Sequence, residues 1–136
     1  MILFCRPKIV DITKKKVVLY IPLNRQTRNH VKSMYIGTMT VGADLVTGLT
    51  AMLSIRRSKR KIILIFKDLN ATFLKRAEGD TYFTCHSVEE IESAVHEVIS
   101  SKDRVNINVP VIATVPDKFG EESVAEFTIT LSMKEY

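Results

Sequence analysis

The stretch SMYIGTMTVGADLVTGLTAMLSI, residues 33–55, is apolar along most of its length and carries a single charge, on Asp44. Its larger apolar residues recur at helical spacing: Val41, Leu45, Leu49 and Met52. Other apolar residues widen this surface beyond one stripe, and a helix of that kind is usually covered by other structure. We therefore predict a long core helix over residues 33–54, wrapped by the rest of the chain.

The same stretch is long enough to suggest a membrane span, but its composition argues against one. It contains three glycines, four threonines and an acid near its centre. An aspartate at the middle of a span costs about 2.5–3.5 kcal/mol, whereas a leucine or isoleucine returns only about 0.5 kcal/mol. We expect a core helix and no membrane span.

The cellular compartment is predicted from the N-terminus and the cysteines. The first ten residues have no basic segment followed by a long apolar run, so they do not read as a secretory signal. Cys5 and Cys85 lie far apart in the sequence and fit a reducing cytoplasm better than a disulfide framework. We expect a cytoplasmic protein.

Strand-like segments surround the core helix. Their positions are residues 9–13, 17–22, 61–66 with a continuation past a bend at 68–70, 80–87, 104–116 and 123–136. A short amphipathic helix is expected at residues 87–101, where Ser87 and Glu90 have the spacing of a capping box. Its predicted buried stripe is Ile91, Val95, Val98 and Ile99.

This order of elements predicts one α+β domain over residues 1–136. Neighbouring strands joined by short turns favour a mostly antiparallel sheet, and the long helix must be what that sheet covers. A curved antiparallel sheet wrapped around one long central helix is the hotdog fold.

The segment NHVKSMYIGTMTVGAD, residues 29–44, resembles a motif of the hotdog thioesterases of the phenylacetate-pathway type. That motif begins with an asparagine, continues through glycines and a His-Gly-Gly triplet, and ends in Ala-Asp on the central helix. In this chain Asn29 and Asp44 have the spacing of the first and last motif residues, and Gly37 aligns with the last glycine of the triplet. The stretches 65–85 and 120–134 resemble strands of the same proteins. More closely, the chain is similar to an uncharacterised branch of the superfamily, whose members are often described only as unconfirmed thioesterases or as a domain of unknown function.

Three positions depart from the family pattern. Tyr35 stands where histidine is usual, Ile36 replaces the first glycine of the pair, and Lys32 replaces an earlier glycine. The histidine helps to hold the substrate carbonyl in related enzymes, so its replacement bears directly on whether this chain is catalytically active.

The resemblance implies an acyl-CoA or related acyl-thioester hydrolase. Asp44 would act as general base or nucleophile, the Gly37 backbone N–H would receive charge on the carbonyl oxygen, and Asn29 would orient water or the carbonyl. Each residue also has a structural explanation. Asp44 could be an acid satisfied by amides or a cation, Asn29 a turn or helix-cap residue, Gly37 a packing residue, and Tyr35 a packing residue or a replacement donor.

Seven residues separate Gly37 from Asp44, roughly 10 Å along a helix. One helix therefore cannot easily bring both to the same carbon. The resemblance implies a homodimer or a dimer of dimers, in which the acid of one subunit faces the helix start of the other.

No cofactor is expected, since coenzyme A would enter as part of the substrate. It is polyanionic, and the residues expected to bind its phosphates are Arg25, Arg28 and Lys32 near the site and Lys75, Arg76 and Arg104 near strand ends. Tyr35 is a further candidate contact. The three histidines and two cysteines have no metal-ligand spacing, so we predict no metal.

Five of the six residues 56–61, RRSKRK, are basic. We interpret them as a solvated turn at a helix C-terminus, where cations suit the helix dipole. Nucleic-acid binding through this run is a weaker alternative, and no aromatic residue is interleaved for base stacking. A second functional alternative is an acyl-CoA or acyl-chain sensor or carrier without turnover, which the altered residues 35–37 keep open.

Overall fold

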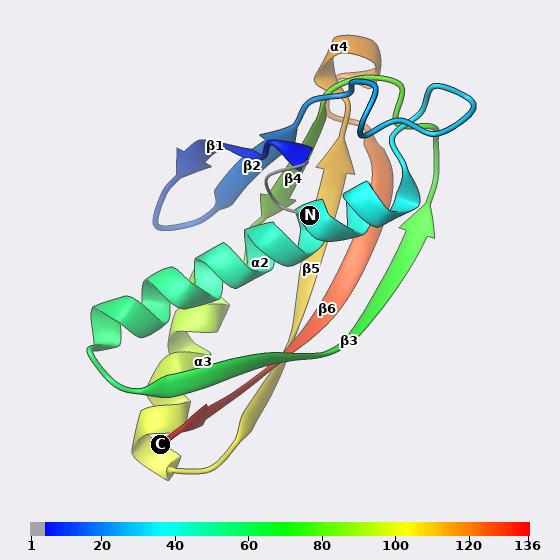
Figure 1. Cartoon of the computed structure of the whole chain (residues 1–136). Helices are drawn as coiled ribbons and strands as arrows, with labels where there is room; N and C mark the ends of the chain where they lie inside the picture. Colours follow the sequence, from blue (N-terminus) through cyan, green and yellow to red (C-terminus); the bar gives the residue numbers. More distant parts are fainter. Residues whose placement is uncertain (1–4) are drawn as a thin grey trace.

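Figure 1 shows the computed structural model of the chain, which describes residues 5–136. A six-stranded antiparallel sheet in the order β1-β2-β4-β5-β6-β3 curves around helix α2, and this confirms the predicted α+β class. The strands are β1 (Lys8–Ile12), β2 (Val17–Ile21), β3 (Ile62–Phe73), β4 (Thr81–Cys85), β5 (Val105–Thr114) and β6 (Ser123–Glu135). The helices are α2 (Ile36–Ser58), α3 (Val88–Ser101) and α4 (Pro116–Phe119).

Strand β6 forms the centre of the core because its sequence alternates between apolar and polar residues. Its inward side chains are all buried: Ala125, Phe127, Ile129, Leu131 and Met133. The opposite face is less exposed than the alternation predicts, since Thr130 and Ser132 are also buried. Thr130 Oγ1 donates to Asn108 Oδ1 at 2.8 Å, and Arg104 Nη1 donates to Ser132 Oγ at 3.0 Å, so these hydroxyls are satisfied by β5 and the turn before it.

Helix α2 crosses the concave face of the sheet (Figure 1). It begins at Ile36, three residues later than predicted, because Met34 and Tyr35 donate their N–H groups to Ala77 and Thr27 of neighbouring segments. It continues to Ser58, four residues beyond the predicted end, and stops at Lys59, whose φ of 59° is left-handed.

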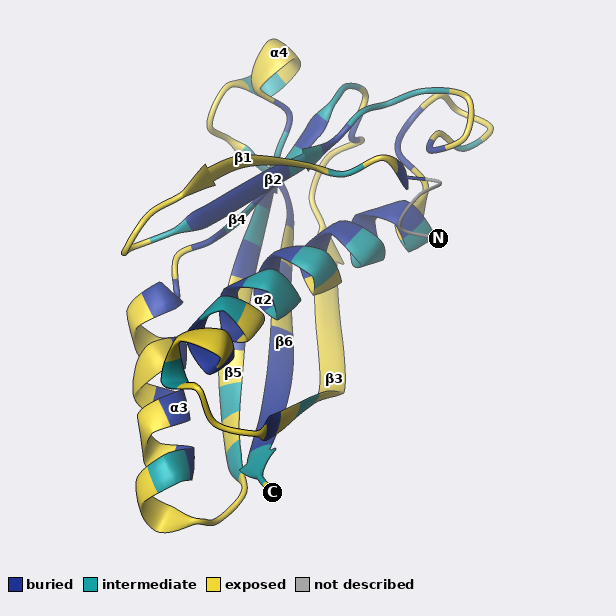
Figure 2. Ribbon diagram, turned by 60° about the vertical axis from the view of Figure 1, so that its left-hand side comes forward, coloured by how far each residue is buried: buried dark blue, intermediate teal, exposed yellow. Residues whose placement is uncertain are grey.

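The sheet covers only one side of α2. Ala43, Val46 and Ala51 are fully buried, whereas Asp44 and Met52 are exposed and Val41, Leu45 and Leu49 are half-buried (Figure 2). The predicted wrapping of the helix by the sheet is therefore present, but within this chain it covers one side of α2. The side of α2 that the sheet leaves open contains the predicted acid.

Strand β3 forms one edge of the sheet and pairs only with β6. The pairing register shifts between Phe66 and Asp68, just before the bend predicted at residues 68–70, and residues 68–73 pair regularly with β6. Large apolar side chains are exposed along the strand: Ile63, Ile65, Phe66, Leu69 and Phe73. Figure 2 shows β3 exposed along most of its length.

Helix α3 packs its buried face against α2, β5 and β6. Val88 and Ala94 join this face, while Ile99 is only half-buried. The predicted capping box does not form: the Ser87 side chain makes no cap hydrogen bond, and its φ and ψ of −101° and 29° lie outside the extended region that such a cap needs.

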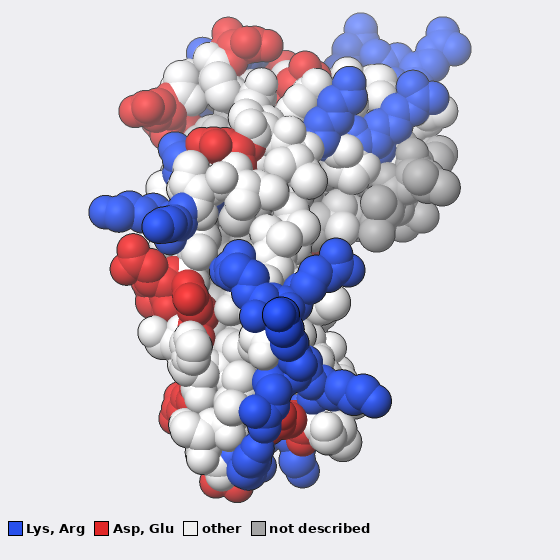
Figure 3. Space-filling model, turned by 90° about the vertical axis from the view of Figure 1, so that its left-hand side faces the viewer, with Lys and Arg blue, Asp and Glu red and all other residues white. Residues whose placement is uncertain are grey.

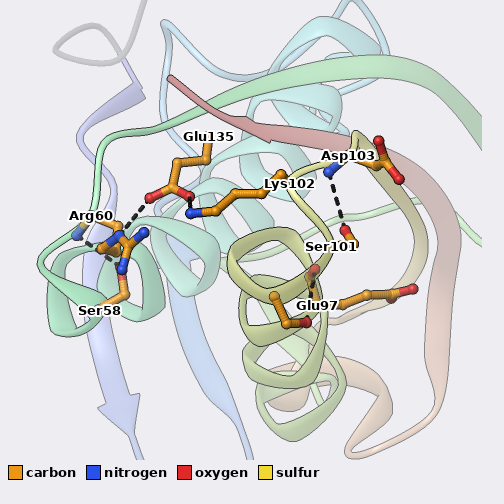
Figure 4. Close-up of polar contacts among 8 residues, drawn as sticks. Ser58, Arg60, Glu97, Ser101, Lys102, Asp103 and Glu135 are labelled. Carbon is orange, nitrogen blue, oxygen red and sulfur yellow. Dashed lines mark hydrogen bonds and ion pairs between the residues drawn. The ribbon is translucent and has the colours of Figure 1, made fainter.

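The C-terminal ends of α2, α3 and β6 meet at one ionic cluster. Glu135 accepts hydrogen bonds from Arg60 and from Lys102, the latter at 2.8 Å (Figure 4). These bonds and charges hold the pKa of Glu135 below its ordinary value, with Arg60 the larger contributor. The cluster fixes the turn that leads from α2 into β3.

One helix of the described residues, α2, is long and apolar enough to pass a length-and-composition test for a membrane span, and 44% of its apolar window is buried within the chain. Because that buried part packs on the sheet, α2 is the core helix of this fold.

Candidate active site

The open side of α2 faces β3 across a cleft that holds two cavities. The first, here called the mid-helix cavity, has a volume of about 290 Å³. It is lined by Thr40 and Asp44 of α2, by residues 66–69 of β3 and by Ile129 of β6. The second, the helix-start cavity, has a volume of about 440 Å³ and lies between the beginning of α2 and the chain that follows β3.

Asp44 is the only α2 acid, and the fold places it on the wall of the mid-helix cavity. Partial burial among apolar neighbours raises the pKa of its carboxyl group above the ordinary value. In the described part of the chain, the carboxylate has no ion-pair partner and accepts no hydrogen bond. The satisfied structural acid that the sequence left open is thus not what this chain shows. Asp44 is only partly buried, because much of its surface is exposed.

Gly37 is the second residue of α2, as expected for a helix-start donor. Tyr35 precedes the helix without a side-chain cap, and the first N–H that finds an acceptor is that of Met39, which donates to Tyr35 O at 3.0 Å. Across residues 5–136, the N–H groups of Ile36, Gly37 and Thr38 are left without acceptors. Three donors at the positive end of a helix dipole suit an anion or an oxyanion.

The ring of Tyr35 packs against Gly37. A Cβ placed on Gly37 would lie 2.5 Å from Tyr35 Cε1, so the absence of a side chain there makes room for this ring. Tyr35 itself is 55% exposed and lines neither cavity. Gly37 therefore serves packing, by making room for the Tyr35 ring, and it also has a free N–H group.

Asn29 lines the helix-start cavity and also builds the loop in front of it. Its Oδ1 accepts the N–H groups of Val31 and Ser33 at 3.0 and 3.1 Å. The turn role is thus established for the side-chain oxygen. The Nδ2 group has no acceptor in the described chain, and it remains the atom that could contact a ligand.

Four of the predicted basic residues divide into two pairs. Lys75 and Arg76 line the helix-start cavity, although Lys75 also pairs with Glu122 at 3.0 Å. Arg28 and Lys32 are exposed on the loop before α2 and line neither cavity.

The sequence analysis missed two residues of the cleft. Ser33 is 4% exposed and lines the helix-start cavity, and its hydroxyl has no hydrogen-bond partner in the structure. Asp68 also lines the mid-helix cavity, but it pairs with Thr130, next to the inward-facing Ile129, so strand alternation directs its carboxylate to the other face of the sheet. The register shift between Phe66 and Asp68 keeps Phe66 and Leu69 on the helix side of β3, and a sequence pattern does not reveal this.

The structure places Asp44 at the mid-helix cavity and, separately, Asn29, Lys75 and Arg76 at the helix-start cavity. It does not join the two sets, because no residue lines both cavities. Within residues 5–136, no group of three or more His, Cys, Asp or Glu side chains is placed to hold a metal ion.

Comparison with solved structures identifies the fold. A Pseudomonas aeruginosa protein of unknown function, named a probable thioesterase, matches 99% of this chain and 87% of its own length with a TM-score of 0.81 at 21% identity. A Chlorobaculum tepidum protein of unknown function matches 99% of this chain and 86% of its own length with a TM-score of 0.85 at 13% identity. A thioesterase from Haemophilus influenzae matches 98% of this chain and 82% of its own length with a TM-score of 0.72 at 8% identity.

These likenesses confirm the predicted hotdog fold. No curated protein matches the chain. The family model described as a domain of unknown function, DUF4442, matches residues 4–133, and the chain therefore belongs to the DUF4442 family.

Proposed function

We propose that this protein hydrolyses acyl thioesters, with acyl-CoA as the substrate class, and that it does so as a dimer. The observation that carries the proposal is the Asp44 carboxylate. It lies on a cavity wall, it has no partner in the described chain, and partial burial raises its pKa, which makes the carboxylate a stronger base than a fully solvated one. The fold shared with structures named as thioesterases supports the same chemistry.

In the proposed reaction, Asp44 removes a proton from water, and the water oxygen bonds to the carbonyl carbon of the thioester. The carbonyl oxygen becomes negatively charged and is received by the free N–H groups at the start of α2, that of Gly37 above all. When the carbon–sulfur bond breaks, the thiolate takes a proton, and the products are a carboxylic acid and a free thiol. The alternative is direct attack by Asp44, which would give an acyl anhydride that water then hydrolyses.

The dimer follows from the distance between the two groups within one chain: Asp44 lines the mid-helix cavity, whereas Gly37 lines neither cavity and lies two helical turns away. Strand β3 offers the surface for it, since one edge of this strand is unpaired and several of its apolar side chains are exposed. An exposed apolar edge strand usually pairs with another chain. Antiparallel pairing of two β3 strands would place the mid-helix cavities near the two-fold axis and cover the open side of α2 around Asp44.

Coenzyme A phosphates would be bound near the helix-start cavity. Arg76 lines this cavity and makes no ion pair in the described chain, whereas Lys75 is already engaged by Glu122. Arg28 and Lys32 would contribute only from the exposed loop beside it. Asn29 would donate from Nδ2, since its oxygen is used by the loop.

A second candidate, binding of acyl-CoA without turnover, is favoured by one contact. The Tyr35 ring lies against Gly37, where a hydrolase must leave room for the thioester carbonyl.

The test is an assay of short-, medium- and long-chain acyl-CoAs with the wild type, Asp44→Asn and Asp68→Asn. The proposal expects turnover that is lost in Asp44→Asn and largely kept in Asp68→Asn, its matched neutral substitution in the same cavity. Tight binding without turnover by all three proteins would support the sensor or carrier. Loss confined to Asp68→Asn would overturn the assignment of Asp44.

A further inference from the structure

The basic run 56–61 does not act alone in the folded chain. The turn between β1 and β2 carries three lysines, residues 14–16, and Lys14 and Arg57 line the same cavity. Figure 3 shows Lys and Arg side chains gathered in a column on the face that contains the end of α2. We call residues 14–16 and 56–61 together the basic end of the molecule.

The basic end carries more than half of the net charge of the protein. It holds eight of the 20 basic residues, and the acids that contact it or share a cavity with it are Glu135, Glu89, Glu92, Asp11 and Glu121. Eight cations against five acids leave this end with a charge of +3, out of the net charge of +5. In the described chain, only Arg60 of the eight basic residues forms an ion pair.

Exposed apolar side chains lie among these cations. Ile12 is 47% exposed and lines the cavity that contains Lys14 and Arg57. Met52 is 50% exposed and precedes Arg56 by one helical turn, so the two share a face of α2. A phosphate backbone gives such side chains nothing to contact, whereas the boundary between headgroups and acyl chains takes them up.

We propose that the basic end binds the surface of an anionic membrane. The lysines and arginines lie at the lipid headgroups, and Ile12 and Met52 enter the boundary beneath them. Residues 14–16 and Ile12 belong to the opposite edge of the sheet from β3, and they stay accessible when two β3 strands pair. The inference does not depend on thioester hydrolysis.

The experiment is co-sedimentation of the full chain with phosphatidylcholine vesicles that contain or lack phosphatidylserine, at about 0.1 M salt. Binding is expected only with the anionic lipid. Each basic side chain near such a surface contributes about fivefold, so the variant Lys14→Gln/Lys15→Gln/Arg57→Gln should weaken binding about a hundredfold. The control Arg25→Gln/Arg28→Gln/Lys32→Gln removes the same charge at the other end of α2 and should weaken it far less.

A further variant, Ile12→Ser/Met52→Gln, separates a membrane from nucleic acid. It should weaken vesicle binding while leaving all charges in place. The proposal is overturned if the wild type does not bind anionic vesicles or binds neutral ones equally well. Equal losses in the two triple variants would overturn it too. The proposal is also overturned if the same lysines bind duplex DNA and if Ile12→Ser/Met52→Gln leaves vesicle binding unchanged.

Discussion

The ring of Phe83 on β4 occupies the space that a side chain on Gly42 of α2 would need. Both residues are buried, so the helix and the sheet approach each other closely at a point where the helix has no Cβ. This contact sets the depth of α2 in the sheet, and with it the position of Asp44 two residues later.

Gly42→Ala should therefore destabilise the fold, by about 1–3 kcal/mol, because the new methyl group meets a rigid aromatic ring. The matched control is Gly48→Ala in the same helix. Its Cβ would lie 3.3 Å from Phe66 Cζ, on a partly exposed edge-strand side chain that can move. Alanine is favoured over glycine in a helix by about 1 kcal/mol, so this control should be neutral or stabilising. Urea unfolding of both variants is the measurement, and equal effects would contradict the account.

Ser33→Ala should stabilise the protein by up to about 1 kcal/mol, because it removes a buried hydroxyl that has no partner. Ser54→Ala should do the same, since Ser54 Oγ is likewise buried and unpaired but lines neither cavity of the cleft. The two variants are expected to differ in KM for acyl-CoA, which should rise only for Ser33→Ala. An unchanged KM would show that the helix-start cavity does not hold substrate near Ser33.

The raised pKa of Asp44 predicts an effect of pH on stability. In the folded state this carboxyl holds its proton more tightly than in the unfolded chain, so its ionisation opposes folding. The penalty is absent below the unfolded pKa and complete once the pH exceeds the folded pKa. Asp44→Asn should thus be slightly more stable than the wild type at pH 7, by no more than about 0.5 kcal/mol for so exposed a group, with the difference vanishing in acid. Thermal unfolding at several pH values checks the sign, and a less stable variant at neutral pH would contradict it.

A charge on the β3 edge should break the proposed dimer. Ile65 is 50% exposed, and Ile65→Lys should shift sedimentation from dimer to monomer without unfolding the chain. The control is Ile9→Lys on β1, the other edge of the same sheet, which should leave the dimer intact. If only Ile9→Lys dissociated the dimer, the interface would lie at the β1 edge of the sheet, and the β3 interface would be contradicted.

Much of the fold could be predicted from periodicity and spacing. The alternation along β6 and the apolar stretch of α2 were enough to predict an antiparallel sheet around a core helix. The helix boundaries were missed because the bonds that hold Met34 and Tyr35 out of the helix come from Thr27 and Ala77, which lie in other segments. The capping box at Ser87 failed because the backbone there is not extended.

The site was harder to predict than the fold. Asp44 and Gly37 could be named from the resemblance, but the exposure of Asp44 depends on how far β3 stands from α2, and no local pattern encodes that distance. Ser33 and Asp68 were missed for the same reason, since each becomes a cleft residue only through contacts made across the chain.

The central claim is that Asp44 of one subunit works with the start of α2 of the other. Gly37→Pro removes the proposed donor N–H in the first turn of the helix, where proline is tolerated. Gly37→Ala is the control, because alanine adds a Cβ but keeps the N–H. The decisive measurement is acyl-CoA hydrolysis by a refolded mixture of two inactive variants, Asp44→Asn and Gly37→Pro. The account predicts that activity reappears, since a mixed dimer has one site with both groups intact. The account would be contradicted if the mixture were as inactive as each variant alone. This result counts only if each variant still dimerises and Gly37→Ala is active.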